Sequence, residues 1–230
     1  MKPAGSGQKI CLNVLRWVRF NYKLTGRLKR IKSWSSRGTG LKTRESGMPE
    51  EDRWVTFFDP EFILGELGLD RNCQTVVDLG CGYGTFSIPA ARRISGKVYA
   101  IDIDPLMVET CQAKVEKAGL SNIICQQRDF VAEGTGMPDQ SADFVMLFNI
   151  LHAENPISLV KEAYRVLVPG GKVGIIHWNY DPTTPRGPSM DIRPRPEQCR
   201  AWVQAAGFEL LKPMIDFPPY HYGMTGIKGE

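Results

Sequence analysis

A chain of 230 residues is long enough to bury the core of one α/β domain without help from disulfides or metals. Its 42% hydrophobic and 23% charged residues are typical of a protein that folds in water, and they argue against a wholly disordered, collagen-like or membrane-embedded chain. No segment approaches the roughly 18 uninterrupted apolar residues of a spanning helix. We therefore expect one main domain and no transmembrane segment.

The six cysteines lie apart in the sequence, and no two of them form a CxxC pair. This spacing favours free thiols in a reducing compartment over a disulfide framework, and it offers no structural zinc site. We expect no bound metal and a cytoplasmic protein.

The net charge of +4 hides an uneven distribution. Residues 1–44 contain twelve Lys or Arg and no Asp or Glu, whereas the remaining 17 basic and 25 acidic residues give residues 45–230 a net charge of −8. We predict that residues 1–44 are a basic, flexible extension and that residues 45–230 form the functional domain.

Basic residues within 9–32 recur every three or four positions and would share one face of a helix. Such a face predicts contact with an anionic surface, either a membrane or nucleic acid. An arginine-rich, acid-poor segment is also typical of an import peptide, which would direct the protein to an organelle.

The predicted elements begin with two short helices, one opening at Pro49 and one over 61–67 that Asp59 caps and Gly68 ends. Strands and helices then alternate. Strands are predicted at 75–79, 97–101, 122–127, 143–148 and 172–178, and helices at 86–94, 105–118 and 157–168. This βαβ repetition indicates a doubly wound, mostly parallel sheet, which binds ligands outside the carboxyl ends of its strands.

Three alternate glycines, Gly80, Gly82 and Gly84, lie in the turn between the first strand and its helix. Without β-carbons the backbone can approach a ligand closely and present its N–H groups. The second strand then ends at Asp102, where a carboxylate can accept hydrogen bonds from both ribose hydroxyls of a nucleotide-like ligand. The two features together predict a nucleotide-like cofactor.

The nicotinamide and flavin fingerprint requires Gly or Ala where this chain has Thr85. The observed pattern is GxGxG with Asp78 two residues ahead, and it resembles the first motif of class I S-adenosylmethionine-dependent methyltransferases. The resemblance continues through four further segments and covers residues 45–230. These are Asp102, 128–130, 147–152 and 164–172, the last typical of the branch that includes the ubiquinone and menaquinone methyltransferases.

The resemblance implies a seven-stranded sheet that ends in an antiparallel hairpin, with strands at 208–216 and 221–227 and the seventh strand between the fifth and sixth. It implies S-adenosylmethionine as the cofactor. The residues that it implies as cofactor ligands are Asp78, Gly80, Cys81, Gly82, Gly84, Asp102, Ile103, Asp129, Phe130 and Asn149.

Methyl transfer from a sulfonium is an in-line displacement, so the protein has to align the reacting atoms and accept a proton where the acceptor is a hydroxyl or protonated amine. His152 and His177 follow or end strands at the ligand-binding edge and are candidate general bases, as is His221. The alternative for each is a hydrogen-bonded structural histidine.

The acceptor is predicted to be a small molecule. No (Asn/Asp)-Pro-Pro-(Tyr/Phe) motif follows the fourth strand, where Asn149-Ile150-Leu151 stands instead, and this disfavours methylation of a base nitrogen or a glutamine amide. The acidic domain also disfavours nucleic acid. Two alternatives remain: an S-adenosylmethionine-binding interaction module without turnover, and a nicotinamide-dependent oxidoreductase.

A long connector at 181–198 contains five prolines and leaves the sheet at its ligand-binding edge, as a lid over the site would. Its arginines either face an anionic acceptor or keep the loop soluble. These are Arg186, Arg193 and Arg195.

Three aromatic residues ahead of the sheet either cover the pocket from the other side or belong to the core. These are Trp54, Phe57 and Phe58.

Overall fold

The computed structural model describes residues 48–230, so the predicted basic extension, its helical face over 9–32 and the predicted domain boundary after residue 44 lie outside the described residues. Those expectations stay predictions. Among the described residues, no helix combines the length and the apolar character needed to cross a bilayer.

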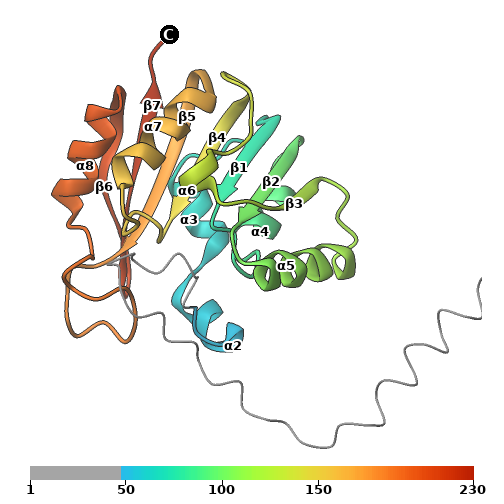
Figure 1. The fold of residues 1–230 in the computed structure, drawn as a ribbon, viewed down its shortest axis with the longest axis horizontal. Helices are drawn as coiled ribbons and strands as arrows, with labels where there is room; N and C mark the ends of the chain where they lie inside the picture. Colours follow the sequence, from blue (N-terminus) through green and yellow to red (C-terminus); the bar gives the residue numbers. More distant parts are fainter. Residues whose placement is uncertain (1–47) are drawn as a thin grey trace, which may run out of the picture. The chain divides into compact units, whose positions relative to one another are not determined.

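The centre of the fold is a seven-stranded sheet with the order β3-β2-β1-β4-β5-β7-β6 (Figure 1). Neighbouring strands from β3 to β5 run parallel, and β7 pairs antiparallel with both β5 and β6. The strands are β1 Thr75–Leu79, β2 Lys97–Asp102, β3 Ile123–Gln127, β4 Ala142–Phe148, β5 Leu167–Trp178, β6 Phe208–Phe217 and β7 His221–Lys228. The predicted doubly wound sheet and its terminal hairpin are confirmed.

Helices cover both faces of this sheet because alternate residues of the buried strands point to opposite sides. Val76 packs with α3, α4 and α5, whereas its neighbour Val77 packs with α6, α7 and α8. The helical elements are α2 Glu51–Trp54, η1 Val55–Phe57, α3 Pro60–Glu66, α4 Ser87–Arg93, α5 Pro105–Lys117, α6 Phe130–Glu133, α7 Pro156–Val166 and α8 Pro196–Ala205.

Two helices start where their sequence signals predict. Asp59 accepts a hydrogen bond from the backbone N–H of Phe62 at 3.1 Å, and Asp104 accepts one from that of Leu106 at 2.9 Å. Each cap is followed by a proline at the first helical position, where the missing N–H costs nothing. Asp104 is therefore the helix cap, which leaves Asp102 available for another role.

Two boundaries differ from the prediction. Residues 167 and 168, predicted as helical, belong to β5, because Leu167 takes an extended conformation and pairs with Ala142. The predicted connector to residue 198 is also too long, since α8 begins at Pro196. Proline at the first turn of a helix looks, in the sequence, like one more proline of the preceding loop.

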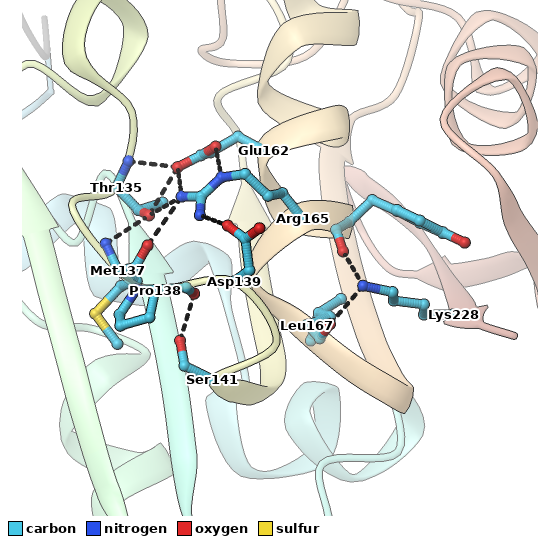
Figure 2. A network of polar contacts seen from close by, with 10 residues as sticks. Thr135, Met137, Pro138, Asp139, Ser141, Glu162, Arg165, Leu167 and Lys228 are labelled. Carbon is cyan, nitrogen blue, oxygen red and sulfur yellow. Dashed lines mark hydrogen bonds and ion pairs between the residues drawn. The ribbon is translucent and has the colours of Figure 1, made fainter. Parts of the chain in front are cut away.

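A polar network fastens the loop between α6 and β4 to α7 (Figure 2). Glu162 accepts hydrogen bonds from the backbone and hydroxyl of Thr135, and Arg165 pairs with both Glu162 and Asp139. The hydrogen bonds from Arg165 are the main cause that lowers the pKa of Glu162 to about 2. The network keeps this loop in place beside the segment that carries Asp129.

Candidate active site at the carboxyl ends of the strands

A cavity of about 670 Å³ opens at the carboxyl ends of β1, β2 and β4. It gathers most of the residues that the sequence selects: Asp78, Gly80, Cys81, Asp102, Ile103, Asp129, Phe130, Asn149 and His152. Of the remaining selected residues, Gly82 and Gly84 lie in the same turn without lining the cavity, and His177 lies behind its wall. The geometry brings the predicted residues together, while their roles stay predictions.

The glycine turn is held by backbone hydrogen bonds to the neighbouring strand. The N–H groups of Gly80 and Cys81 donate to the carbonyl of Ile101 at 2.8 and 3.1 Å. Gly80 has φ of +81°, and a β-carbon at this position would lie 2.9 Å from the Ile150 side chain. Both the conformation and the close approach therefore require glycine.

Asp102 fixes the turn from the opposite side. It is 4% exposed, and its carboxylate accepts the N–H of Gly82 at 2.9 Å and that of Asp104 at 3.0 Å. Burial raises the pKa of Asp102 above its ordinary value, against the opposing effect of these two hydrogen bonds. Each oxygen has a second lone pair to offer a ligand in the cavity.

Asp78 is the second buried carboxyl of the cavity wall. It is 2% exposed and accepts a hydrogen bond of 2.5 Å from the Ser87 hydroxyl. Burial, with a smaller contribution from the charge of Asp102, raises its pKa to about 7 despite that hydrogen bond. Asp78 consequently changes its charge near neutral pH.

Two further side chains show that the cavity is built for a polar ligand. Asn149 and Thr85 line the cavity, and both amide atoms of Asn149 and the hydroxyl of Thr85 are buried with no hydrogen-bond partner among the described residues. Asn149 also has φ of +55°, an uncommon conformation for a residue other than glycine. Buried polar atoms are normally paired, so this strain and these open atoms indicate a ligand that supplies the partners.

Asp129 follows β3 and begins α6. Its side chain accepts a hydrogen bond from the N–H of Ala132 at 3.1 Å, and it lines the cavity together with Phe130. The neighbouring Arg128 donates to the carbonyl of Gly134 at 2.8 Å and braces the segment. Asp129 is thus a helix cap and a cavity residue at once, rather than a purely solvated loop acid.

The histidines occupy different environments. His152 lines the cavity, and its ring lies 5.6 Å from that of His177. His177 and His221 are fully buried, with no hydrogen-bond partner among the described residues at either ring nitrogen. Burial holds the pKa of His177 well below its ordinary value and lowers that of His221 to about 3. Both are neutral at pH 7, and His152 is the one that reaches the cavity.

Aromatic side chains form the wall opposite the glycine turn. Trp54 and Trp178 line the cavity with their ring centroids 6.4 Å apart. Behind them, Phe57 packs edge-on against Trp178 at 5.3 Å, and Phe58 packs against His221 at 4.5 Å. Trp54 therefore covers the pocket, whereas Phe57 and Phe58 belong to the packing that supports it.

The loop after β5 carries the three arginines that the sequence selects, and they differ in role. Arg193 is 7% exposed, so it is neither a solvated charge nor free to rotate. Its guanidinium donates to the carbonyls of residues 179, 181, 186 and 188 and to the Thr184 hydroxyl. Arg186 lines the main cavity, and Arg195 lines a second cavity of about 390 Å³.

The comparisons with known proteins agree with this geometry. Residues 76–171 match the family model described as a methyltransferase domain. A solved structure of an S-adenosylmethionine-dependent methyltransferase from Aquifex aeolicus is similar with a TM-score of 0.69 at 27% identity, over 77% of this chain and 93% of that one. The sheet, its terminal hairpin and the motif order are thus those of the class I S-adenosylmethionine-dependent methyltransferases, whose cofactor is S-adenosylmethionine.

Three curated relatives each match less than half of this chain. Aklanonic acid methyltransferase DauC from Streptomyces sp. strain C5 is 32% identical over 103 residues, which are 44% of this chain and 46% of the relative. Demethylmenaquinone methyltransferase from Lactobacillus johnsonii is 34% identical over 112 residues, 47% and 45% of the two chains. A ribosomal protein L11 methyltransferase from Dechloromonas aromatica is 37% identical over 111 residues, which are 46% of this chain and 34% of the relative. The chain therefore spans less than half the length of each.

Three parts of the site have no signal in the sequence motifs. The sequence analysis identifies Thr85 only as a mismatch to the nicotinamide fingerprint, yet Thr85 lines the cavity. Met48 and Trp178 also line it from outside every motif. The position of Thr85, one residue beyond the glycine turn, is a signal that could have found it, because residues next to such a turn approach the same ligand.

Proposed function

We propose that this protein transfers a methyl group from S-adenosylmethionine to a small-molecule acceptor. The observation that carries the proposal is the pair of unpartnered polar groups, the Asn149 amide and the Thr85 hydroxyl, buried in the wall of a cavity that the glycine turn and Asp102 also line. A ligand with both hydrogen-bond donors and acceptors satisfies these atoms.

The cofactor supplies an activated methyl group on a positively charged sulfur. Asp102 would accept hydrogen bonds from its ribose hydroxyls, because its carboxylate is already fixed by two backbone N–H groups. Ile103, Asp129 and Phe130 would hold the adenine, and the glycine turn with Asn149 would hold the methionine end. The aromatic wall of Trp54 and Trp178 excludes water from the space beside it.

His152 is the residue that we assign to proton transfer. It lines the cavity, and an ordinary imidazole accepts a proton near neutral pH. His177 stays neutral behind it, since burial holds its pKa well below the ordinary value, and it contributes to the position of the His152 ring. In this assignment the Nε2 or Nδ1 atom of His152 takes the proton from an acceptor hydroxyl or amine.

A small acceptor is supported by the size and enclosure of the site. The cavity of about 670 Å³ lies within the range of small-molecule sites, and the loop over residues 179–195 lines it opposite the strands. The net charge of −8 over residues 45–230 works against nucleic acid as the acceptor. We assign the protein to the cytoplasm as part of the same proposal.

Calorimetric titration with S-adenosylmethionine, S-adenosylhomocysteine and NADH tests the cofactor assignment. We expect saturable binding of the first two and none of the third. Binding of NADH alone would contradict the proposal. An acceptor screen with a radiolabelled methyl donor then separates an enzyme from a binding module, which is the alternative function: binding without turnover on any small-molecule acceptor would favour the module.

A further inference from the structure

The second cavity adjoins the main one and contains an excess of positive charge. It shares His152, Ala153, Asp191 and Ile192 with the main cavity as lining residues, so the two cavities adjoin at these residues. Its volume of about 390 Å³ leaves room for one polar substituent with its adjoining atoms. The proposed function gives no role to this space.

Arg193 provides a buried charge beside this cavity. Its hydrogen bonds go to backbone carbonyls and one hydroxyl, and among the described residues no carboxylate forms an ion pair with it, although the more distant charge of Asp181 acts on it. Carbonyl dipoles solvate a guanidinium without cancelling its charge. Because the side chain is 7% exposed, water screens that charge poorly, and the charge favours an anion in the adjacent space.

Arg195 provides a second, differently placed charge. Its guanidinium lies 3.7 Å from the ring centroid of Tyr180, and both side chains line the second cavity. No described carboxylate pairs with Arg195, whereas Arg200, within α8, pairs with Glu197 at 3.3 Å. Stacking on Tyr180 orients the planar donor fork of Arg195 before a ligand arrives.

Among the described lining residues the other charged group is Asp191, so two guanidinium groups face one carboxylate there, while Asp181 acts on Arg193 from outside the lining. The start of α8 makes the potential in the cavity more positive. Gln198 in the first turn of α8 lines the cavity, and the amino end of a helix carries a partial positive charge. Glu197 opposes this effect but is paired with Arg200. The net potential favours an anionic substituent.

We propose that the second cavity binds a carboxylate of the methyl acceptor, while a flat apolar body of the same molecule lies against Trp54 and Trp178 in the main cavity. The two cavities meet at His152, which places the proton-accepting ring between the apolar body and the carboxylate. Arg195 binds the carboxylate, because its guanidinium has N–H donors that are not used by a described carboxylate. This assignment of an aromatic or otherwise flat carboxylic acid rests on the proposed function.

The test compares 3-hydroxy-2-naphthoate with its neutral analogue 3-hydroxy-2-naphthamide by calorimetry on the full chain saturated with S-adenosylhomocysteine. We expect the carboxylate to bind about tenfold more tightly than the amide, as a charge-assisted hydrogen bond would give. Arg195→Gln should reduce this preference to about twofold or less. Arg200→Gln, on the same helix but outside the cavity, should keep it.

Each result decides between the two proposals. If S-adenosylhomocysteine binds and the preference for the carboxylate is absent, or survives in Arg195→Gln, the second cavity is not an acid site and the proposed function stands. If S-adenosylhomocysteine does not bind, the titration is repeated without it, and a preference that depends on Arg195 then supports the anion site while the proposed function fails. Unchanged affinity of Arg195→Gln for S-adenosylhomocysteine shows that the variant is folded.

Discussion

The two halves of the ligand-binding edge are built in different ways. In the half formed by β1, β2 and β3, the site residues lie at or shortly after the ends of their strands, and hydrogen bonds such as that from the Gly82 N–H to the Asp102 carboxylate hold the turns. In the half formed by β5 and β7, a loop of 179–195 is held by one buried side chain, Arg193, and by rings from distant parts of the sequence. The site residues of the β1, β2 and β3 half are therefore placed by local structure at the strand ends, and we call this half local. The β5 and β7 half depends on contacts between distant parts of the sequence, and we call it long-range.

The largest effect that separates the halves is expected from Arg193→Ala. Removing a guanidinium that is 7% exposed leaves several partly buried carbonyls without their donor and opens a space in the loop, so the free energy of unfolding should fall by about 3–5 kcal/mol. Urea denaturation measures this fall. Arg200→Ala is the control, because its pair with Glu197 is solvent-accessible and should be worth less than about 1 kcal/mol. Equal losses in the two variants would contradict the role of Arg193 as the brace of the loop.

A change in the local half should affect binding instead of global stability. Asp102→Ala removes the carboxylate that we assign to the ribose and should weaken S-adenosylhomocysteine by about 1–3 kcal/mol, or roughly five- to 150-fold. Isothermal calorimetry gives the affinity directly. Asp104→Asn is the matched control, because asparagine caps a helix as well as aspartate does. Unchanged affinity in Asp102→Ala would overturn the ribose assignment.

The buried histidines of the long-range half predict a loss of stability in mild acid. The pKa of His221 is lowered to about 3 by burial and by the charge of Arg193, whereas the unfolded chain has an ordinary value near 6.5. The unfolded state therefore binds more protons between these values, and stability falls as pH drops below about 6.5. From pH 7 to pH 5 the cost of His221 alone is about 2 kcal/mol.

His221→Phe should remove that part of the pH dependence. A phenyl ring fits among Phe58 and Trp178 and removes the two unpaired ring nitrogens of His221 from the core. Urea denaturation at pH 7 and pH 5 measures the difference for both proteins. His152→Phe is the comparison, since His152 lines the cavity and is not fully buried. A slope that is the same in the parent and in His221→Phe would show that His221 is not buried as a neutral ring.

The contrast between the local half and the long-range half also explains which features of the fold and the site could be predicted from the sequence. The five parallel strands and the caps at Asp59 and Asp104 follow from local patterns, because apolar runs, capping residues and glycines act within a few positions, whereas β6 and β7 are implied only by the family resemblance. The residues selected at the ends of β1, β2 and β4 line one cavity for the same reason, while their roles stay predictions. Parallel strands bring their carboxyl ends to one edge, so local motifs are sufficient to place them together.

The long-range half resists this reasoning. The start of α8 has no Ser, Thr, Asp or Asn cap, since Arg195 stands at that position, and Pro196 merges with the prolines of the loop. The role of Arg193 depends on carbonyls of an irregular loop, and no spacing rule predicts which carbonyls a side chain reaches. Trp54 and Trp178 meet across more than a hundred positions of sequence, so their shared wall appears only after the sheet has formed.

The smallest expected effect concerns the basic segment ahead of both halves. The described residues that line the main cavity begin at Met48, and we expect deletion of residues 1–44 to leave the affinity for S-adenosylhomocysteine unchanged within about twofold. The deletion should instead abolish binding to vesicles that contain anionic lipid, because it removes twelve positive charges and leaves a domain of net charge −8. Calorimetry and vesicle co-sedimentation measure the two properties. A tenfold loss of cofactor affinity would show that residues 1–44 contribute to the cofactor site. Unchanged binding to vesicles would show that the positive charge of residues 1–44 does not cause the surface contact.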